Sequence, residues 1–351
     1  MNKFWLAILV LLAGCHRTSE QYINPVLQDQ AFLQGLKELN ITLVAPSSGL
    51  SVKELDALKS LLSGKVKFLP DQHYLKPNPW TNATAKQTAD EITQAMESGG
   101  ILWAVRGGYG ARRLASILSK RRIKSSATIL VGYSDVTALH LLFSARKQKV
   151  CCIHAPVARE LIQEGHDCDG FRLFMGVLSG QIKQIKVNLQ PLNANAKKTS
   201  KLHGPLTGGN LTLVEASIGA VWQADCKDKI LFLEDVGCNP GQVIGSLAHL
   251  EDSGLLDGVK AVVFGRFSKE DDREFIPILF EFADRASFPV FLTDKIGHGY
   301  HNYPIGCGCP GAIEHDVEKP DSFILRVDFS KIPLFKKNPY ARNRNRHSVK
   351  R

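Results

Sequence analysis

Short apolar runs alternate with helix-patterned stretches along the first half of the chain, and this alternation restricts the fold more than any other feature. The first run, residues 41–45, ends in a Pro-Ser-Ser-Gly turn, and a capping-box pattern of Ser51 and Glu54 then precedes a helix expected over 52–62. Further strands are expected near 66–69, 101–105, 128–131 and 151–154, and further helices at 85–97, 111–118 and 136–145. Such alternation indicates a mostly parallel sheet with helices on both faces. We therefore expect an α/β, doubly wound domain over residues 41–180.

A second domain is expected over residues 205–335, with strands near 230–233, 260–264, 290–292 and 322–327 and a helix near 243–251. The stretch 181–204 is largely polar, rich in Asn and Lys, and we interpret it as an interdomain linker. Residues 16–40 are only weakly patterned and are expected to form a tether. A length of 351 residues fits two domains, and 44% hydrophobic residues is too apolar for a disordered chain.

The first fifteen residues have the pattern of a secretory signal. One positive charge at Lys3 precedes ten apolar residues, too few to span a bilayer, and the segment ends in Leu-Ala-Gly-Cys at Cys15. This ending resembles a bacterial lipobox, in which the cysteine is lipidated and becomes the first mature residue. We therefore expect residues 1–15 to be a lipoprotein signal peptide, and Cys15 to anchor the chain to a membrane facing the periplasm. The alternatives are a soluble-type signal with a chance cysteine and, if the lipobox is not processed, a cytoplasmic protein.

The net charge of +10 is concentrated at the other end of the chain. Residues 336–351 contain seven Lys and Arg and no acid, which leaves +3 for the preceding 335 residues. We interpret this segment as a flexible basic tail, and the distribution argues against nucleic acid as a partner. Of the eight cysteines, seven remain if Cys15 is lipidated, and an odd number leaves at least one unpaired within the monomer.

Ser134 lies where a buried strand is followed at once by a helix, within the sequence Gly-Tyr-Ser-Asp-Val of residues 132–136. A serine at such a corner is exposed above the sheet edge, and its hydroxyl faces the free N–H groups of the helix. These are the properties of a nucleophile elbow, in which the Asp135 N–H could bind developing negative charge. Val136 replaces the last glycine of the strict motif. The alternative is that Ser134 or Asp135 is only a helix N-cap.

A glycine-rich loop over residues 106–110, Arg-Gly-Gly-Tyr-Gly, follows the strand expected at 101–105. Its backbone N–H groups could form a phosphate cradle or half of an oxyanion hole. The loop lacks the third glycine of a dinucleotide fingerprint, and the chain has no Walker lysine, so nucleotide binding is disfavoured.

Two further segments carry groups suited to acid–base chemistry. Glu234 and Asp235 end an apolar strand, although either could instead be a helix cap or a solvated charge. His298 lies in a glycine-flanked loop where it could act as a general base, and Glu234 could fix its tautomer. A metal site of His298, His301, Cys307 and Cys309 is disfavoured by its spacing. His140 falls within a helix and is expected to be a packed core residue.

Six motifs in this order resemble the LD-carboxypeptidase family of serine peptidases, also called murein tetrapeptide carboxypeptidases. They are Val-Ala-Pro-Ser-Ser at 44–48, Arg-Gly-Gly-Tyr-Gly at 106–110, Gly-Tyr-Ser-Asp-Val-Thr-Ala-Leu-His at 132–140, Leu-Thr-Gly-Gly-Asn-Leu at 206–211, Phe-Leu-Glu-Asp-Val-Gly at 232–237, and Gly-His at 297–298 with Pro-Ile-Gly at 304–306. Together they extend over most of the chain after the signal segment.

The resemblance implies a catalytic triad of Ser134, Glu234 and His298. It also implies an oxyanion hole formed by the backbone of Gly107, Gly108 and Asp135.

The same resemblance implies a Rossmann-like N-terminal domain, a smaller β-rich C-terminal domain and frequently a homodimer. The implied reaction releases terminal D-alanine from the diamino acid of a muropeptide, with no metal or organic cofactor. Arg106 and Tyr109 would contact the substrate.

Two other functions remain open at this stage. Peptidases that resemble the microcin C immunity protein share the triad and cleave acyl-nucleotide toxins. Solute-binding lipoproteins also combine a lipobox with two α/β lobes and have no catalytic activity.

Overall fold

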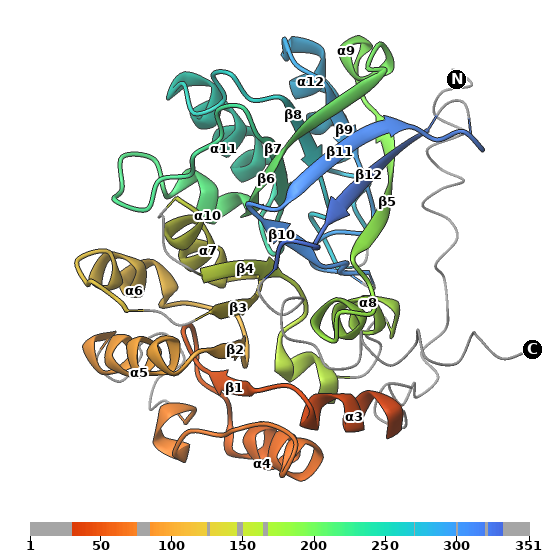
Figure 1. The fold of residues 1–351 in the computed structure, drawn as a ribbon. Coiled ribbons are helices and arrows are strands. Elements are labelled where there is room, and N and C mark those ends of the chain that lie inside the picture. The colour runs from red at the N-terminus through yellow and green to blue at the C-terminus, as the bar shows by residue number, and fades with distance from the viewer. Residues whose placement is uncertain are drawn as a thin grey trace, which may run out of the picture.

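The computed structural model describes residues 30–75, 85–124, 127–145, 150–163, 168–269, 271–299, 301–319 and 322–332. The expected signal segment with Cys15 and the basic tail 336–351 lie outside these residues. Within them, the chain forms an open sheet with its helices and a closed barrel (Figure 1). None of the described helices is both long and apolar enough to cross a bilayer.

The N-terminal sheet has the strand order β1-β2-β3-β4-β10. Its parallel strands are β1 (Ile41–Val44), β2 (Gly100–Ala104), β3 (Thr128–Gly132) and β4 (Val150–His154). Their residues are almost all buried, which explains why they form continuous apolar runs rather than alternating ones. The helices between them are α4 (Val52–Leu62), α5 (Ala85–Ser98), α6 (Ala111–Leu118) and α7 (Thr137–Ser144). The expected parallel sheet is confirmed.

Helices cover both faces of this sheet. In Figure 1, α5 and α6 lie on one side of the strands, and α8 (Cys168–Leu178) lies on the other. The buried Trp103 of β2 packs against Phe171 and Phe174 of α8, with ring centroids 6.5 and 5.4 Å apart. The Ser51–Glu54 capping box at the start of α4 is present in both directions, so the sequence signal identified the helix boundary correctly.

The second half of the chain forms a closed barrel with the strand order β11-β12-β5-β9-β8-β7-β6. The strands are β5 (Gln184–Pro191), β6 (Lys201–Asn210), β7 (Ile230–Glu234), β8 (Ala261–Phe264), β9 (Val290–Leu292), β11 (Pro310–His315) and β12 (Phe323–Asp328). Strands β6 to β9 pair in parallel, and the other pairs are antiparallel. The accompanying helices are α9 (Ala194–Lys197), α10 (Leu211–Glu215), α11 (Pro240–Asp252) and α12 (Ile276–Arg285). The expected β-rich C-terminal part is confirmed.

The linker expected over residues 181–204 is wrong for most of its length. Residues 184–191 form β5, which pairs with β12 and β9 inside the barrel, and α9 and the start of β6 follow. Ile185, Val187 and Leu189 are buried while the residues between them are exposed. This is a period of two, as a half-buried strand requires, but the intervening Lys and Asn residues made the stretch look uniformly polar.

Two smaller expectations also differ from the structure. The tether expected over 16–40 ends in a helix, α3 (Gln30–Lys37), whose Leu33 and Leu36 are buried in the core. The strand expected near 66–69 is reduced to one bridge between Thr42 and Lys67.

One strand crosses from the C-terminal half of the chain to the N-terminal sheet. Strand β10 (Ile305–Cys307) pairs antiparallel with β4, so that Ile305 lies opposite His154 (Figure 1). Directly after it, the Gly308 N–H donates to the carbonyl of Leu206 in β6 at 2.7 Å. Strand β10 therefore joins the sheet to the barrel.

Candidate active site

Ser134 stands at the corner between β3 and the short 3-10 turn Ser134–Val136 that leads into α7. Its φ of 61° lies in the left-handed region, which costs a non-glycine residue about 1–3 kcal/mol and is concentrated at functional sites. Neither helical start here has a side-chain cap hydrogen bond, so the N-cap alternative does not account for the serine. The Asp135 carboxylate instead accepts the N–H of Ala111, the first residue of α6, at 2.8 Å. The strained backbone and the sharp corner are those of a nucleophile elbow.

The glycine-rich loop 106–110 packs directly against this serine. A Cβ atom on Gly107 would lie 2.9 Å from the Ser134 Cβ and 3.0 Å from its Oγ, so only glycine allows this approach. Gly108 has a φ of 112°, and a Cβ there would meet the Ser48 hydroxyl at 2.3 Å. Within the described residues, the N–H groups of Gly107 and Gly108 make no hydrogen bond. They are therefore available to an oxyanion formed at Ser134.

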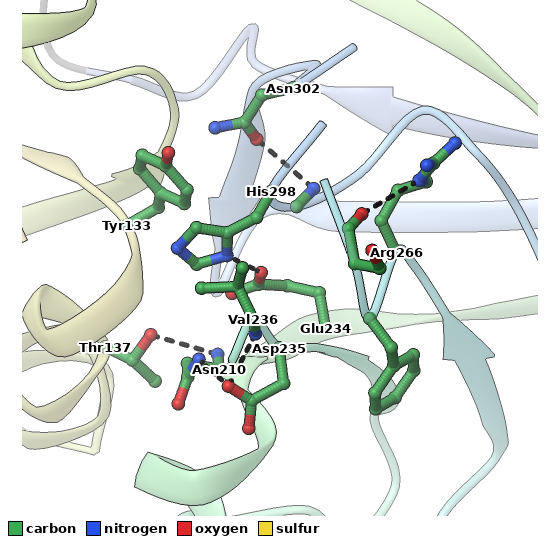
Figure 2. A network of polar contacts seen from close by, with 12 residues as sticks. Tyr133, Thr137, Asn210, Glu234, Asp235, Val236, Arg266, His298 and Asn302 are labelled. Atoms are coloured by element: carbon green, nitrogen blue, oxygen red, sulfur yellow. Dashed lines mark hydrogen bonds and ion pairs between the residues drawn. The ribbon is translucent and has the colours of Figure 1, made fainter. Parts of the chain in front are cut away.

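Glu234 and His298 are brought together from two separate segments of the barrel half of the chain. The His298 Nδ1 lies 2.6 Å from the Glu234 Oε2, and both side chains are buried (Figure 2). Burial alone raises the pKa of Glu234, but the His298 imidazole outweighs it and holds that pKa below its ordinary value. An ionised Glu234 fixes the Nδ1–H tautomer of His298 and leaves Nε2 free to accept a proton.

Gly297 permits this contact, because its φ of 102° suits glycine and a Cβ there would lie 2.6 Å from the Glu234 Cβ. The alternative of a solvated Glu234 is contradicted, since the side chain is fully buried.

Aromatic side chains pack around the His298 imidazole in addition to its contact with Glu234. The Tyr133 ring stands beside the His298 ring, with centroids 4.6 Å apart (Figure 2). The Tyr133 hydroxyl donates to the Glu160 carboxylate, which also accepts the Val157 N–H at 3.1 Å. Burial and the neighbouring Glu160 raise the pKa of Tyr133 well above its ordinary value, so the phenol stays neutral. His154, at the end of β4, packs edge-on against Tyr133 and is fully buried.

Asp235 connects the base of the site to the start of α10. Its carboxylate accepts hydrogen bonds from the Asn210 amide at 2.7 Å, the Thr212 hydroxyl at 2.7 Å and the Val236 N–H at 2.8 Å. Burial and the charge of Glu234 raise the pKa of Asp235. The Thr137 hydroxyl, on α7, accepts the Asn210 N–H at 3.1 Å (Figure 2), so this network also joins the two halves of the molecule.

These residues border a cavity of about 640 Å³ between the sheet and the barrel. Ser134 and His298 both line it. The sheet side adds Arg106 and Arg159; Arg106 donates to the Gly49 carbonyl at 3.1 Å, and Arg159 forms an ion pair with Glu54. The cavity thus exposes a serine, an imidazole and two guanidinium groups to one ligand.

Every residue expected to act in the reaction lies on this cavity or directly beneath it. The lining residues are Arg106, Gly107, Gly108, Tyr109, Ser134, Asp135 and His298, and Glu234 is buried behind His298. His301, Cys307 and Cys309 form no metal-binding cluster with His298, and no such cluster is present elsewhere in the described residues. His140 is fully buried within α7, as expected of a core residue.

Sequence reasoning missed the residues that support the imidazole. Tyr133 was part of the serine motif without a role, and Glu160 and His154 were not assigned one. A polar residue inside an apolar strand, such as His154 in β4, is the kind of signal that could have identified one of them.

Family models and individual relatives assign the chain to the same protein family. Residues 41–155 match the LD-carboxypeptidase N-terminal domain, and residues 203–313 match the LD-carboxypeptidase C-terminal domain. A Rickettsia conorii protein provisionally named a carboxypeptidase is 38% identical over 283 residues, 77% of this chain and 86% of that protein. The chain belongs to the LD-carboxypeptidase family. The Pseudomonas aeruginosa murein tetrapeptide carboxypeptidase is 26% identical over 281 residues, 76% of this chain and 91% of that protein.

Solved structures share the fold of this family member. The muramoyltetrapeptide carboxypeptidase of Oxalobacter formigenes superposes with a TM-score of 0.67 at 23% identity, covering 82% of this chain and 98% of that one. An MccF-like protein of Streptococcus pneumoniae in complex with AMP gives a TM-score of 0.67 at 18% identity, covering 84% and 100%. Both kinds of protein therefore use the same fold, and the fold alone does not distinguish their substrates.

Proposed function

We propose that the protein is a serine-type LD-carboxypeptidase that releases terminal D-alanine from muropeptide tetrapeptides. One observation carries the proposal: Ser134, with its strained backbone, and His298, paired with the buried Glu234, line the same cavity. The chain that holds them belongs to the LD-carboxypeptidase family. The substrate class comes from the relatives that are named murein and muramoyl tetrapeptide carboxypeptidases.

The residues would share the reaction in two half-steps. His298 accepts the Ser134 proton as the serine oxygen attacks the carbonyl carbon, and Glu234 stabilises the resulting imidazolium. The oxyanion accepts hydrogen bonds from backbone N–H groups, for which we propose Gly107, Gly108 and Asp135. His298 then returns the proton to the D-alanine nitrogen as the C–N bond breaks. Water, deprotonated by the same imidazole, cleaves the ester and restores Ser134.

Arg106 suits the carboxylate of the departing D-alanine. Burial and the neighbouring Arg159 lower the pKa of Arg106, whereas the charge of Glu54 opposes this shift. Glu54 provides one negative charge for the two guanidinium groups, and a substrate carboxylate would supply the second. Tyr109 is 57% exposed at the same cavity and would cover the bound peptide.

D-alanine release from a defined disaccharide-tetrapeptide, with a Ser134→Ala variant as the control, tests the proposal. We expect release by the wild type and a loss of about 10⁶-fold in kcat for the variant, as in other serine hydrolases. Equal release by the variant would overturn the serine mechanism. A wild-type protein that binds the peptide without releasing D-alanine would instead support a solute-binding role.

An acyl-adenylate analogue tests the microcin-type alternative in the same assay. We expect turnover of the muropeptide to exceed that of the analogue. The opposite preference would place the protein with the immunity peptidases.

We also propose that Cys15 carries lipid and holds the enzyme on the periplasmic side of the cell envelope, since the lipobox-like ending supports such processing. Metabolic labelling with a fatty acid should mark the wild type and leave a Cys15→Ala variant unmarked.

A homodimer is a further proposal, drawn from the family resemblance. Sedimentation of the mature chain measures its mass in solution and tests this proposal.

A further inference from the structure

A carboxylate on the barrel side of the cavity is oriented by two side chains of α11. Glu215, the last residue of α10, accepts a hydrogen bond from the Ser246 hydroxyl at 2.7 Å on Oε2. The His249 Nδ1 lies 3.1 Å from Oε1. No Lys or Arg of the described residues forms an ion pair with Glu215. A carboxylate offers about four acceptor positions, so acceptor capacity remains on both oxygens.

Glu215 is the accessible member of the carboxylates that line the cavity. Asp135, Glu160 and Asp235 also line it, but each is at most 5% exposed and accepts hydrogen bonds from protein donors. The Glu215 side chain is 30% exposed. Among the described lining residues, it is therefore the carboxylate that a ligand can reach.

Hydrogen bonds fix this carboxylate relative to the reacting groups. Thr212 lies one helical turn before Glu215 on α10, and its N–H and hydroxyl both donate to Asp235. Asp235 follows Glu234 in the chain, so the helix that carries Glu215 is tied to the residue beside the catalytic pair. Glu215 thus belongs to a rigid wall and not to a mobile loop.

We propose that Glu215 binds the side-chain ammonium of the diamino acid on the acyl side of the scissile bond. This inference rests on the proposed function, because that substrate carries a carboxylate on the leaving residue and an ammonium on the acyl residue. Arg106 and Arg159 lie on the sheet wall of the cavity, and Glu215 lies on the barrel wall. Lys269, which follows β8, also lines the cavity but forms no ion pair with Glu215 in the described part of the chain. Two guanidinium groups and an accessible carboxylate therefore face the cavity from different walls. An ammonium is a compact donor, which suits a single carboxylate with spare acceptor positions.

Two tetrapeptides that differ only at the third residue test this assignment. One carries lysine and the other norleucine, which has a similar length but no amino group. We expect the wild type to prefer the lysine peptide by about tenfold in kcat/KM, the lower end for a hydrogen bond to a charged group. Glu215→Gln should bring this ratio close to one. Glu251→Gln, on α11 but paired with Arg285, is the matched control and should keep the wild-type ratio.

A purely structural tie between α10 and α11 would give a different result. In that case Glu215→Gln would lower the melting temperature and leave the lysine-to-norleucine ratio unchanged, which would overturn the proposal. Calorimetry measures the binding of both peptides to Ser134→Ala and to the double variant Ser134→Ala, Glu215→Gln, so that affinity is compared without turnover. A preference for the lysine peptide that depends on Glu215 supports the site even if the wild type releases no D-alanine. Absence of release would then refute only the carboxypeptidase function. Equal binding of the two peptides would overturn the site.

Discussion

Substituting Gly107 by alanine tests whether the backbone of the glycine-rich loop borders Ser134, the nucleophile that we propose. The added Cβ would lie 2.9 Å from the Ser134 Cβ and 3.0 Å from Oγ, whereas non-bonded carbon atoms prefer about 3.5–4.0 Å. Gly107 does not have a left-handed φ, so its backbone accepts alanine without strain of its own. The clash between the added Cβ and the Ser134 side chain must therefore be relieved by a movement of the glycine-rich loop or of Ser134.

The expected loss of activity follows from the size of this movement. The contacts are short by about 0.5–1 Å, and a misplacement of about 1 Å in a reacting group costs about 100-fold. This corresponds to about 2.7 kcal/mol in the activation free energy. The shift would also displace the N–H groups that we assign to the oxyanion. We expect kcat/KM for D-alanine release to fall at least 100-fold in Gly107→Ala.

A matched glycine on the same cavity provides the control. Gly245 lines the cavity from α11, and a Cβ there would meet no atom within 4 Å. Gly245→Ala should keep wild-type activity and gain up to about 1 kcal/mol of stability, because alanine favours a helix over glycine. Thermal melting of both variants separates a local effect from unfolding. Wild-type kcat/KM in a folded Gly107→Ala protein would refute the geometric argument.

Two further predictions concern buried titratable groups. Glu234→Gln should lower kcat by about 10⁴-fold, because an amide N–H facing Nδ1 selects the wrong tautomer of His298; a loss below tenfold in the same assay would contradict its role. Burial lowers the pKa values of His140 and His154 to about 3 and about 4, so the unfolded chain binds more protons below about pH 6.5. The free energy of unfolding should therefore fall as the pH decreases below about 6.5, by up to about 1.4 kcal/mol per pH unit for each histidine. Urea denaturation between about pH 7 and pH 5 should show a shallower decline in His140→Leu, and an unchanged slope would refute this reasoning.

The residues that we propose to react could be located from the sequence because each lies at a local sequence signal. Ser134 follows a buried strand and precedes a helix, Glu234 ends another strand, and His298 lies between two glycines. These signals identify positions at strand ends, where open α/β folds place their sites. The order of the motifs then related these positions to one family.

The supporting residues could not be predicted because their roles depend on contacts between distant segments. Glu160 reaches Tyr133 from the following 3-10 helix (Ala158–Ile162), and Ser246 and His249 reach Glu215 from another helix. No local period or motif marks such a pair. Strand β5 was missed for a different reason, since its alternating Ile185, Val187 and Leu189 are separated by Lys186 and Asn188.

Strand β10 restricts how the protein can be made and divided. The edge of β4 has the sequence Val-Cys-Cys-Ile-His, and its partner follows about 150 residues later in the chain. At roughly 5–20 residues per second, a ribosome would leave this apolar edge unpaired for about ten seconds or longer, a period in which edge strands aggregate. A fragment that stops before residue 305 would keep that edge open permanently. The nucleophile-bearing half is therefore not expected to survive as an excised module, and a split enzyme would need its break outside the 150–307 interval to keep both strands in one fragment.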